Sequence, residues 1–568
     1  MEEPIVLKRV FSEFKNLKHK IDINAAAVFL LFFIFNTLKV SVFNLFITSS
    51  TLNTGSILYK LLLSFSITFL LYELLLLFSS RVLISVFFVL QTVYIFANLS
   101  YYLYFHYYLH LSQSSALFSE GLGAAGHFAI PKNLKLLILL VDLPFFIFFL
   151  LLYKRILELK RKLHIIRKFI ALICLSAILI TESWNYVHNY SLAHFIKDYS
   201  SYETLIVERY GTVVNNAVDS WVNRNDQKLI NSLAYGKTIS AKPSAAQKPN
   251  FVIIQVESMD SNIIRKQYNG KYIMPFLNSI SEECIYYPYT LSYHKAGGTS
   301  DCEFSTMNSI EPLDNFPSMK ISSYTYPNSF IKILSANSYH TAVFHGNTAS
   351  YFSRDKAYVK MGFKEFHDMQ KMGLGNVGWG APDKDVFAYT LGQMKKQISP
   401  FLYYVITMTS HGPYTNANYY YDNNNYDGIN NVVVRDYFNS MSYVDQTLNF
   451  FVDFIRENLK NTYIVILGDH TPGIYNDIFR QASFYLDGKY FELVPVMIIT
   501  PEGEIRKEES ISASFLDIAP TILSKSGVSF QYKTNGINLF SYKSAGSIPY
   551  KGSDYDRKLI YEKVSPVN

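Results

Sequence analysis

The stretch FVIIQVES, residues 251–258, is a short apolar run that ends in a polar cluster. Three later runs repeat this pattern: TAVFHG at 341–346, YYVITMTSHG at 403–412 and TYIVILGDH at 462–470. Each run is rich in β-branched or aromatic residues and none is amphipathic, which is typical of strands buried on both faces of a mostly parallel sheet. The second half of the chain is therefore predicted to be an α/β domain with a mostly parallel central sheet.

The polar residues that end these runs indicate where a site would form. In open α/β sheets, ligands bind beyond the carboxyl ends of the strands. The side chains expected to meet at this edge are Glu257, His345, His411, Asp469 and His470. A carboxylate from one strand and Asp-His from another are typical ligands of a divalent metal ion, so the sequence predicts a metal site at this edge.

A Gly-Gly turn lies in KAGGTSDCEF, residues 295–304, and allows the backbone to approach a ligand closely. Ser300 and Glu303 have the spacing of a capping box, which predicts that a helix begins here. Thr299 would then lie beside free N–H groups that favour phosphate. Its hydroxyl is a nucleophile only when activated, for example by a cation; otherwise Thr299 is simply a residue at a helix start.

The first half of the chain is predicted to lie in a membrane. A helix needs roughly 20 apolar residues to cross the hydrocarbon core. Five segments meet this requirement, at approximately 23–46, 57–79, 82–105, 134–153 and 167–187. Lys and Arg cluster before the first segment and after the fourth, and are nearly absent from the first and third connections. The positive-inside rule therefore predicts a multi-pass protein with a cytoplasmic N-terminus and everything after about residue 190 outside.

Composition agrees with two unlike halves. Apolar residues make up 49% of the 568 residues, yet charged residues still make up 17%. We expect a five-span transmembrane domain over 1–189, an extracellular stalk and linker over 190–250, and a catalytic domain over 251–568. The second half has no Lys/Arg block interleaved with aromatic residues, so the net charge of +7 does not suggest nucleic-acid binding.

The three cysteines include no C-x-x-C pair, which argues against thiolate zinc or thioredoxin-like chemistry. Cys284 and Cys302 both lie in the second half and leave a disulfide between them open. Two further segments are predicted as scaffold: WGAPDKDVF at 379–387 opens a helix, and RDYFNSMSYVDQTLNFF at 435–451 has the apolar spacing of a packed helix.

Taken together, the motifs resemble the lipoteichoic acid synthase and phosphoglycerol transferase family, within the alkaline phosphatase and sulfatase superfamily. Their order and spacing match the family, and so does an N-terminal bundle of five spans. The resemblance covers essentially the whole chain. The motifs that carry it are VES at 256–258, GGTSDCEF at 297–304, FHG at 344–346, FSRD at 352–355, TSHGPY at 409–414 and GDHTPG at 468–473.

The resemblance implies an alkaline phosphatase/sulfatase-like fold with one catalytic metal ion, typically Mn²⁺ or Mg²⁺, and Thr299 as the nucleophile. The ligands that it implies are Glu257, Thr299, Asp469 and His470. It also implies that His345, Arg354 and His411 hold the phosphoglycerol group, and a planar guanidinium suits the pairing with phosphate oxygens.

Two positions of the implied head-group site depart from the family pattern. Phe352 stands where a Trp lining the glycerol site is expected, and Asn347 stands where an Asp is expected. The metal chemistry does not depend on either residue. These departures leave open which head group the protein transfers, and plain packing is an equal interpretation of Phe352.

The implied activity is a membrane-anchored, metal-dependent transferase. It would move phosphoglycerol from phosphatidylglycerol, through a covalent intermediate on threonine, to a hydroxyl of a glycan or polyglycerol phosphate in the cell envelope. His411 would protonate the leaving oxygen or hold it in place. A phosphoethanolamine transferase or phosphodiesterase of the same superfamily remains an alternative, as does a non-catalytic envelope scaffold. A sulfatase would need a formylglycine made from Cys or Ser, whereas this position is Thr299.

Overall fold

The computed structural model describes residues 22–47, 54–105, 109, 140–188, 190–197, 199–222, 226–243, 248–314, 316–397, 400–421, 426–506, 508–541 and 546–564. These residues form two compact units, which divide between Arg224 and Asn225. We call the first the helical unit and the second the sheet unit.

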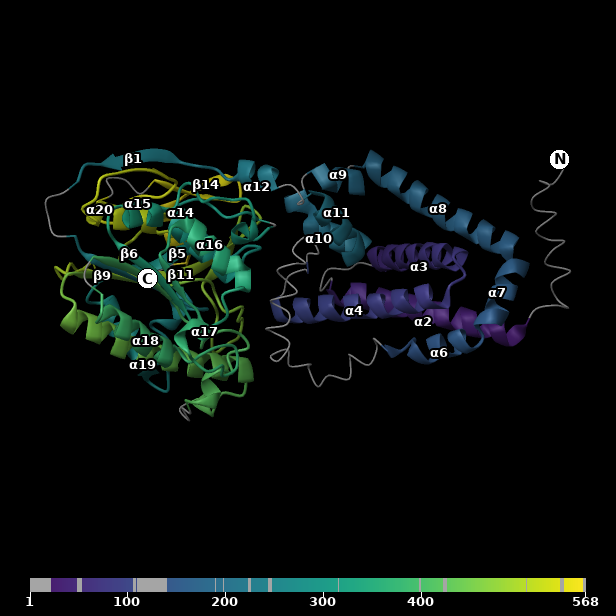
Figure 1. Cartoon of the computed structure of the whole chain (residues 1–568), viewed down its shortest axis with the longest axis horizontal. Coiled ribbons are helices and arrows are strands. Elements are labelled where there is room, and N and C mark those ends of the chain that lie inside the picture. Colours follow the sequence, from purple (N-terminus) through teal and green to yellow (C-terminus); the bar gives the residue numbers. More distant parts are fainter. Residues whose placement is uncertain are drawn as a thin grey trace. The chain divides into compact units, whose positions relative to one another are not determined.

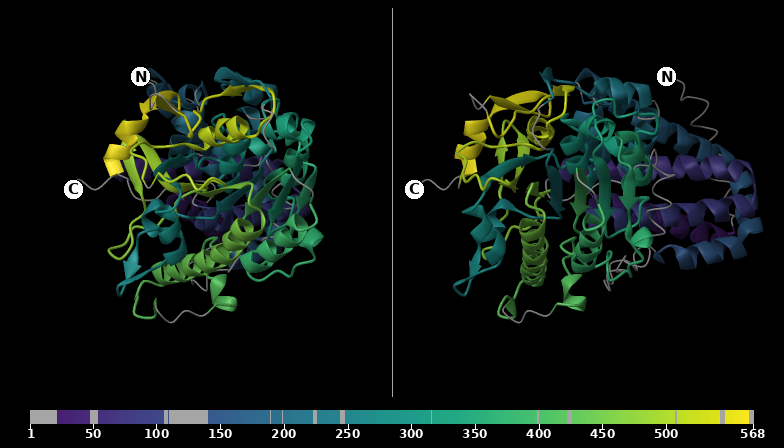
Figure 2. Two further views of the ribbon diagram at one scale, coloured as in Figure 1. Left: turned by 90° about the vertical axis from the view of Figure 1, so that its left-hand side faces the viewer. Right: turned by 60° about the vertical axis from the view of Figure 1, so that its left-hand side comes forward.

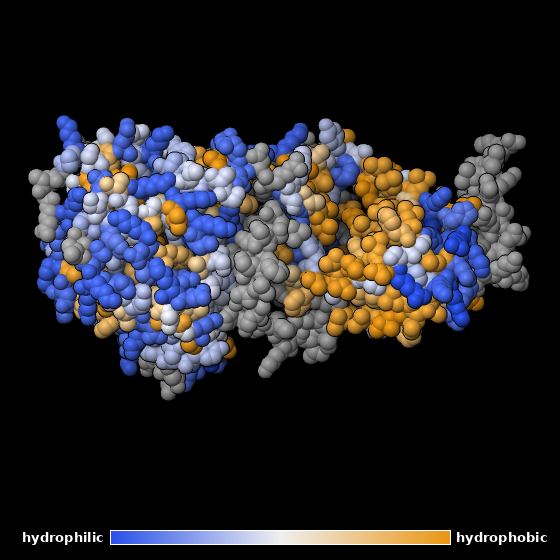
Figure 3. Space-filling view, viewed as in Figure 1, coloured by the Kyte–Doolittle hydropathy of each residue, from blue (hydrophilic) through white to orange (hydrophobic). Residues whose placement is uncertain are grey.

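The helical unit contains the apolar helices that the sequence predicts and several shorter ones. Its main helices are α2 (Ile23–Ile47), α3 (Thr54–Leu77), α4 (Arg81–Phe105), α6 (Leu143–Leu151), α7 (Tyr153–Lys162) and α8 (His164–Val187). The shorter helices α9 (Leu192–Lys197), α10 (Tyr199–Tyr210) and α11 (Thr212–Val222) follow (Figure 1). Apolar side chains gather on the surface over the main helices, which is typical of a unit whose solvent is lipid (Figure 3).

Three of the five predicted spans are helices long and apolar enough to cross a membrane: Ile23–Asn44, Arg81–Leu99 and His164–Val187. Within the described residues, Leu61–Leu77 is apolar but shorter, so five spans are not confirmed. The predicted segment at 134–153 lies partly outside the described residues. Its described part ends with α6, and the basic stretch that follows is not a loop but helix α7, which buries Tyr153, Ile156 and Leu159.

Charged side chains within the helical unit are paired. The Lys39 Nζ lies 2.7 Å from the Asp142 Oδ2, and both side chains are fully buried. Arg167 forms an ion pair with Glu73. Pairing of this kind lowers the cost of placing charge among apolar helices.

The sheet unit is built on an eight-stranded sheet in the order β10-β11-β9-β2-β8-β6-β7, with β5 paired to β11. The four quoted runs form β2 (Asn250–Val256), β6 (His340–His345), β8 (Phe401–Ile406) and β9 (Thr462–Gly468), as the sequence predicts. They lie side by side and parallel, together with β7 (Glu365–His367). The strands β5 (Ile285–Ser292), β10 (Ser483–Leu486) and β11 (Lys489–Ile499) add antiparallel pairs, so the whole sheet is mixed.

Helices cover both faces of this sheet. Alternate residues of β2 enter two separate apolar cores: Phe251 and Ile253 enter one, and Val252 and Ile254 enter the other. Helices α18 (Asp383–Met394) and α19 (Val432–Asn458) line one side (Figures 1 and 2). They correspond to the two segments predicted as scaffold, 379–387 and 435–451. The other helices of the unit are α12 (Asp226–Ser232), α13 (Pro275–Ser281), α14 (Thr299–Asn308), α15 (Phe330–Ala336), α16 (Arg354–Met361), α17 (Met369–Met372), α20 (Ile518–Lys525) and α21 (Arg557–Val564).

Strand register brings the polar ends of the runs to one edge. Val256 pairs with Gly468, and Gln255 and His345 are both level with Ile406. The backbones also approach closely there, because a Cβ added at Gly468 would lie 2.1 Å from the carbonyl oxygen of Met259. Only glycine permits this approach, which places the residues after β2 beside those after β9.

Two details differ from what the sequence suggests. The predicted linker begins with strand β1 (Lys237–Ala241), which pairs with β12 (Phe530–Thr534). Most side chains of β1 are exposed, so the segment carries no apolar signal, and its order comes from backbone pairing. Cys284 and Cys302 are free, buried thiols and do not form a disulfide.

Candidate metal and catalytic site

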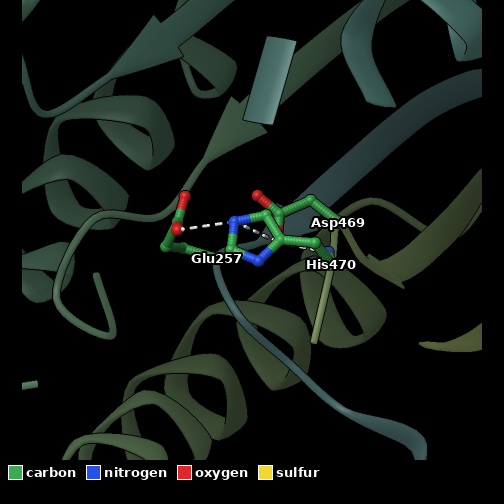
Figure 4. A group of neighbouring side chains, drawn as sticks. All are labelled: Glu257, Asp469 and His470. Carbon is green, nitrogen blue, oxygen red and sulfur yellow. Dashed lines mark hydrogen bonds and ion pairs between the residues drawn. The ribbon is translucent and has the colours of Figure 1, made fainter. Parts of the chain in front are cut away.

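The edge of the sheet carries a compact cluster of possible metal ligands. Glu257 directly follows β2, and Asp469 and His470 directly follow β9. One ligand atom from each of these three residues lies within 4.8 Å of the other two. Figure 4 shows the imidazole of His470 turned toward the carboxylate of Glu257, with 3.1 Å between Nε2 and Oε1.

Hydrogen bonds fix the orientation of these side chains. The Asp469 Oδ1 accepts bonds from the backbone N–H groups of Ser258 (2.8 Å) and His470 (2.7 Å). The His470 Nδ1 lies 2.9 Å from the backbone carbonyl of Thr471, to which it can only donate. This bond selects the tautomer whose Nε2 lone pair is directed to the cluster, as in metal-binding histidines generally.

The electrostatics of the cluster fit a divalent cation. Burial and the negative charge of Glu257 raise the pKa of Asp469 well above its usual range. Although burial opposes it, the carboxylates of Asp469 and Glu257 raise the pKa of His470. A divalent cation among these groups would offset the repulsion between the carboxylates, and carboxylate oxygen with imidazole nitrogen is a donor set that Mn²⁺, Mg²⁺ and Zn²⁺ all accept.

Thr299 joins this cluster. It is the first residue of α14, and its Oγ1 lies 3.1 Å from the Glu257 Oε2, to which it donates. Gly298 precedes the helix with φ 53° and ψ −131°, a conformation that L residues with a side chain avoid. The structure therefore brings together all four residues that the sequence implicates in metal binding.

The predicted capping box is wrong. Gly298 is the N-cap residue, and no side chain caps the helix. The Ser300 Oγ instead donates to the Gly297 carbonyl (2.7 Å), and the Glu303 side chain pairs with Arg354. The turn is held by Asp301, whose Oδ2 accepts the N–H of Gly297 at 2.9 Å. The helix therefore starts two residues earlier than a capping box would place it.

Arg354 lies beside the cluster in a buried ion pair. Its Nε donates to Glu303 at about 3 Å from both carboxylate oxygens, and Tyr358 donates its hydroxyl to the same carboxylate. Its Nη1 lies 3.4 Å from the Nε2 of His345. Burial and the Arg354 charge lower the pKa of His345 well below its usual range, so this ring is neutral. The Nη1 of Arg354 thus faces a neutral ring, which can accept its hydrogen bond and does not repel the charge of the guanidinium.

Asn347 and Phe352 lie near this group in different ways. Asn347 is buried, and its amide nitrogen donates to the carbonyl of Trp379 at 2.8 Å, a bond that an Asp could not make. The ring of Phe352 packs over the guanidinium of Arg354 with 5.2 Å to the ring centre. A Cβ added at Gly298 would lie 3.9 Å from the Phe352 Cζ, so this ring reaches the turn that precedes Thr299.

His411 lies on the loop after β8 and contributes to the electrostatic field at Glu257. Its charge, together with that of His470, holds the pKa of Glu257 below its usual range despite burial, which has the opposite effect. The His411 Nδ1 lies 2.8 Å from the Gly412 carbonyl, to which it can only donate. Its ring stacks on Trp379 at 4.9 Å.

Several residues that shape the site were not identified from the sequence. Glu303 was named only for its capping-box spacing to Ser300, and its ion pair with Arg354 was not predicted. Gln255 reaches both the Thr299 carbonyl and the Asp469 carboxylate, at 3.3 and 3.4 Å. The others are Tyr358, Trp379, His294 and Glu492. Nothing in the local sequence of these residues separates them from ordinary core or surface positions.

Comparison with known proteins agrees with this geometry. Residues 249–528 match the sulfatase family model. The chain is 26% identical over 405 residues to the lipoteichoic acid synthase of Staphylococcus saprophyticus, and the match covers 64% of this chain and 59% of that protein. It is 25% identical over 410 residues to the lipoteichoic acid synthase of Staphylococcus aureus strain USA300, covering 65% of this chain and 60% of that protein.

The chain thus spans about three fifths of the length of these curated relatives. Among solved structures, lipooligosaccharide phosphoethanolamine transferase A of Neisseria meningitidis, an integral membrane protein, is similar with a TM-score of 0.55 and 15% identity. This likeness covers 87% of our chain and 95% of that protein, and it shows a shared fold.

Proposed function

We propose that the protein is a metal-dependent transferase that moves a phosphoglycerol group from a membrane phospholipid, phosphatidylglycerol, to a hydroxyl of an envelope glycan or polyglycerol phosphate. The observation that carries this proposal is the hydroxyl of Thr299, which lies 3.1 Å from Glu257 within a cluster suited to a divalent cation. The similarity of the chain to lipoteichoic acid synthases supports the same chemistry.

Thr299 performs the first step as the nucleophile. A bound Mn²⁺ or Mg²⁺ would supply positive charge that stabilises a threonine alkoxide and offsets the charge of the phosphate. The Oγ1 of Thr299 forms a bond to phosphorus as the bond from phosphorus to the diacylglycerol oxygen breaks. The Thr299 hydroxyl, oriented by its hydrogen bond to Glu257, gives its proton to solvent, and the diacylglycerol oxygen takes a proton from His411.

The second step reverses the roles of these groups. An acceptor hydroxyl attacks the phosphorus on Thr299 and gives its proton to His411. The Thr299 oxygen leaves and regains its proton, so the free enzyme is restored and the kinetics are ping-pong. The His411 Nε2 is suited to this exchange because its Nδ1 proton is engaged with the Gly412 carbonyl.

Residues on the β6 side of the cluster would bind the head group. Glu303 pairs with the Nε edge of Arg354, and Nη1, which carries two N–H groups, would donate one to a phosphate oxygen beside the one directed at His345. His345 would accept from or donate to the glycerol hydroxyls. Asn347 and Phe352 would complete this binding site, with the ring of Phe352 as its apolar wall.

The helical unit would anchor the enzyme in the membrane from which the donor comes. A lipid donor is almost absent from water, so a membrane-anchored enzyme meets it far more often. We place the N-terminus in the cytoplasm and the sheet unit outside the cell or in the periplasm, because the basic residues lie before the first apolar helix and within α7.

The test of this function is a comparison of donors. Purified full-length protein in detergent is incubated with labelled phosphatidylglycerol or labelled phosphatidylethanolamine, with and without EDTA. We expect label on the protein from phosphatidylglycerol, loss of the signal with EDTA and recovery with added Mn²⁺ or Mg²⁺. Transfer that is indifferent to chelation contradicts the role of the metal.

One alternative is favoured by specific residues. Asn347 and Phe352 replace the Asp and Trp expected of phosphoglycerol transferases, and both lie at the head-group side of the site. A phosphoethanolamine transferase would use the same Thr299 and metal cluster with a different head group. Label that appears from phosphatidylethanolamine alone identifies this alternative.

A further inference from the structure

A closed circuit of contacts surrounds the imidazole of His470. Its Nδ1 donates to the Thr471 carbonyl (2.9 Å), and the Thr471 hydroxyl donates to the Glu492 Oε1 (2.6 Å). The Glu492 Oε2 lies 2.8 Å from the His294 Nδ1. The ring of His294 then stacks on the ring of His470, with 4.3 Å between their centres and an interplanar angle of 16°.

The sheet brings these residues together from distant parts of the chain. His294 comes two residues after the end of β5, and Glu492 lies in β11, 198 positions further along. The antiparallel pairing of these strands places Ser292 directly opposite Glu492. Glu492 is 9% exposed, and its two carboxylate oxygens contact His294 and Thr471 on the two sides of the circuit.

We infer that His294 and Glu492 are positioning residues that hold the imidazole of His470 in the orientation needed to bind the metal, an inference that rests on the proposed function. A histidine ligand has two torsions, and a ring free to turn binds a metal less tightly. The hydrogen bond at Nδ1 fixes one edge of the ring, and the stacked His294 fixes its plane. Glu492 connects the two restraints, because its carboxylate contacts both Thr471 and His294.

A purely packing role for these residues leads to a different result. Packing contacts stabilise the fold, so their loss lowers the melting temperature without a specific effect on the metal. A positioning role lowers the affinity for the metal in a protein that remains folded. The affinity for Mn²⁺ and the melting temperature of the metal-free protein therefore separate the two roles.

The experiment measures Mn²⁺ binding to the full-length protein in detergent by titration calorimetry, with the melting temperature of each metal-free variant. We expect His294→Ala to weaken Mn²⁺ binding by roughly 10- to 100-fold, the usual effect of losing such an outer partner. His294→Phe keeps a ring on the face of His470 and should lose less. His340→Ala is the matched control, because His340 pairs with Glu365 in the same way, at 3.0 Å, in another part of the sheet unit.

A double-mutant cycle tests whether the circuit acts as one unit. Glu492→Ala should weaken Mn²⁺ binding about as much as His294→Ala, and the double variant should lose little more than either single variant. The absorption spectrum of bound Co²⁺ should shift in both single variants, since the geometry of the histidine ligand changes, and should be unchanged in His340→Ala.

Unchanged Mn²⁺ affinity in both His294→Ala and Glu492→Ala overturns the inference and leaves the proposed function intact. A wild-type protein that binds no Mn²⁺ overturns both. Weakened Mn²⁺ binding in the variants of a protein that transfers no lipid head group supports the inference and contradicts the proposed function.

Discussion

At the scale of single residues, the central residue of the account is Thr299, whose hydroxyl donates to the Glu257 Oε2 of the ligand cluster. Ser258 also donates to Glu257, but at Oε1 and from within the strand-end loop rather than from the start of α14. The start of a helix favours an anion, and Thr299 is the hydroxyl that lies there.

Thr299→Ala should reduce transfer by at least about a thousand-fold, since a residue that forms the covalent intermediate cannot be replaced by a methyl group. Thr299→Ser keeps the hydroxyl and should retain part of the activity. The rate of diacylglycerol release from phosphatidylglycerol measures both variants. Substantial release by Thr299→Ala would remove Thr299 as the nucleophile.

Glu303 is the second residue whose role can be tested singly. Arg354 and Glu303 are 3% and 0% exposed, so Glu303→Gln would leave a buried guanidinium without its counter-charge. We expect a loss of about 3 kcal/mol or more in the free energy of unfolding, together with weaker substrate binding. Thermal unfolding and KM provide the two measurements.

Glu365→Gln is the control for this change, since Glu365 is 39% exposed and pairs with histidines at the surface. Equal stability of Glu303→Gln and wild type would show that the buried pair is dispensable.

The ion pair between Glu303 and Arg354 also shows where sequence reasoning stops. The Gly-Gly turn before a predicted helix pointed to Thr299, and the family resemblance implied Arg354. The partner of Arg354 lies 51 positions away on another helix, and no local pattern records that contact. The spacing between Ser300 and Glu303 predicted that Glu303 caps its own helix. In the structure the Glu303 side chain instead forms the ion pair with Arg354.

At the scale of elements, the quoted strands could be predicted because each buries both faces and therefore reads as an unbroken apolar run. The strands β1 and β10 could not, since the side chains of β1 are largely exposed and those of β10 are only half-buried. The antiparallel strand β11 joins β5 to the parallel strands, and this connection depends on contacts between distant parts of the chain.

The contact between α13 and α19 provides a test at this scale. Asp445 of α19 caps α13 by accepting the N–H groups of Phe276 (2.9 Å) and Leu277 (2.8 Å). Burial raises the pKa of Asp445 from its ordinary value of 3.8 to about 7. Between these values the unfolded chain loses its proton first, so this carboxyl lowers the stability of the fold as pH rises through that window.

Asp445→Asn removes this titration. The melting temperature of wild type minus that of Asp445→Asn should fall as pH rises from about 4 to about 7 and stay constant above it. Thermal unfolding of both proteins across this range measures the difference. A difference that rises with pH, or that does not change, would mean that Asp445 keeps an ordinary or lowered pKa in the fold.

At the scale of the whole molecule, the chain combines apolar helices with a sheet unit that matches the sulfatase family model. The apolar helices were readable from composition alone, since a run of apolar residues signals lipid directly. The number of crossings was not, because α6 ends after nine residues and α7 is amphipathic. The position where α6 ends and α7 begins depends on how the helices pack, which composition alone does not record.

Orientation in the membrane is a prediction that whole cells can test. Protease added outside intact cells, with the outer membrane removed where one is present, should digest the sheet unit and spare a tag on the N-terminus. Immunoblots of both ends measure this. Loss of the N-terminal tag, or digestion of the sheet unit only after lysis, would reverse the topology.

The most direct measurement of the central claim is mass spectrometry of the peptide that contains Thr299, after incubation of the purified protein with phosphatidylglycerol and Mn²⁺. The account predicts that a glycerophosphoryl group is added to Thr299 and that it disappears when an acceptor alcohol is supplied. An unmodified Thr299 in a protein that turns over its lipid donor would contradict the account.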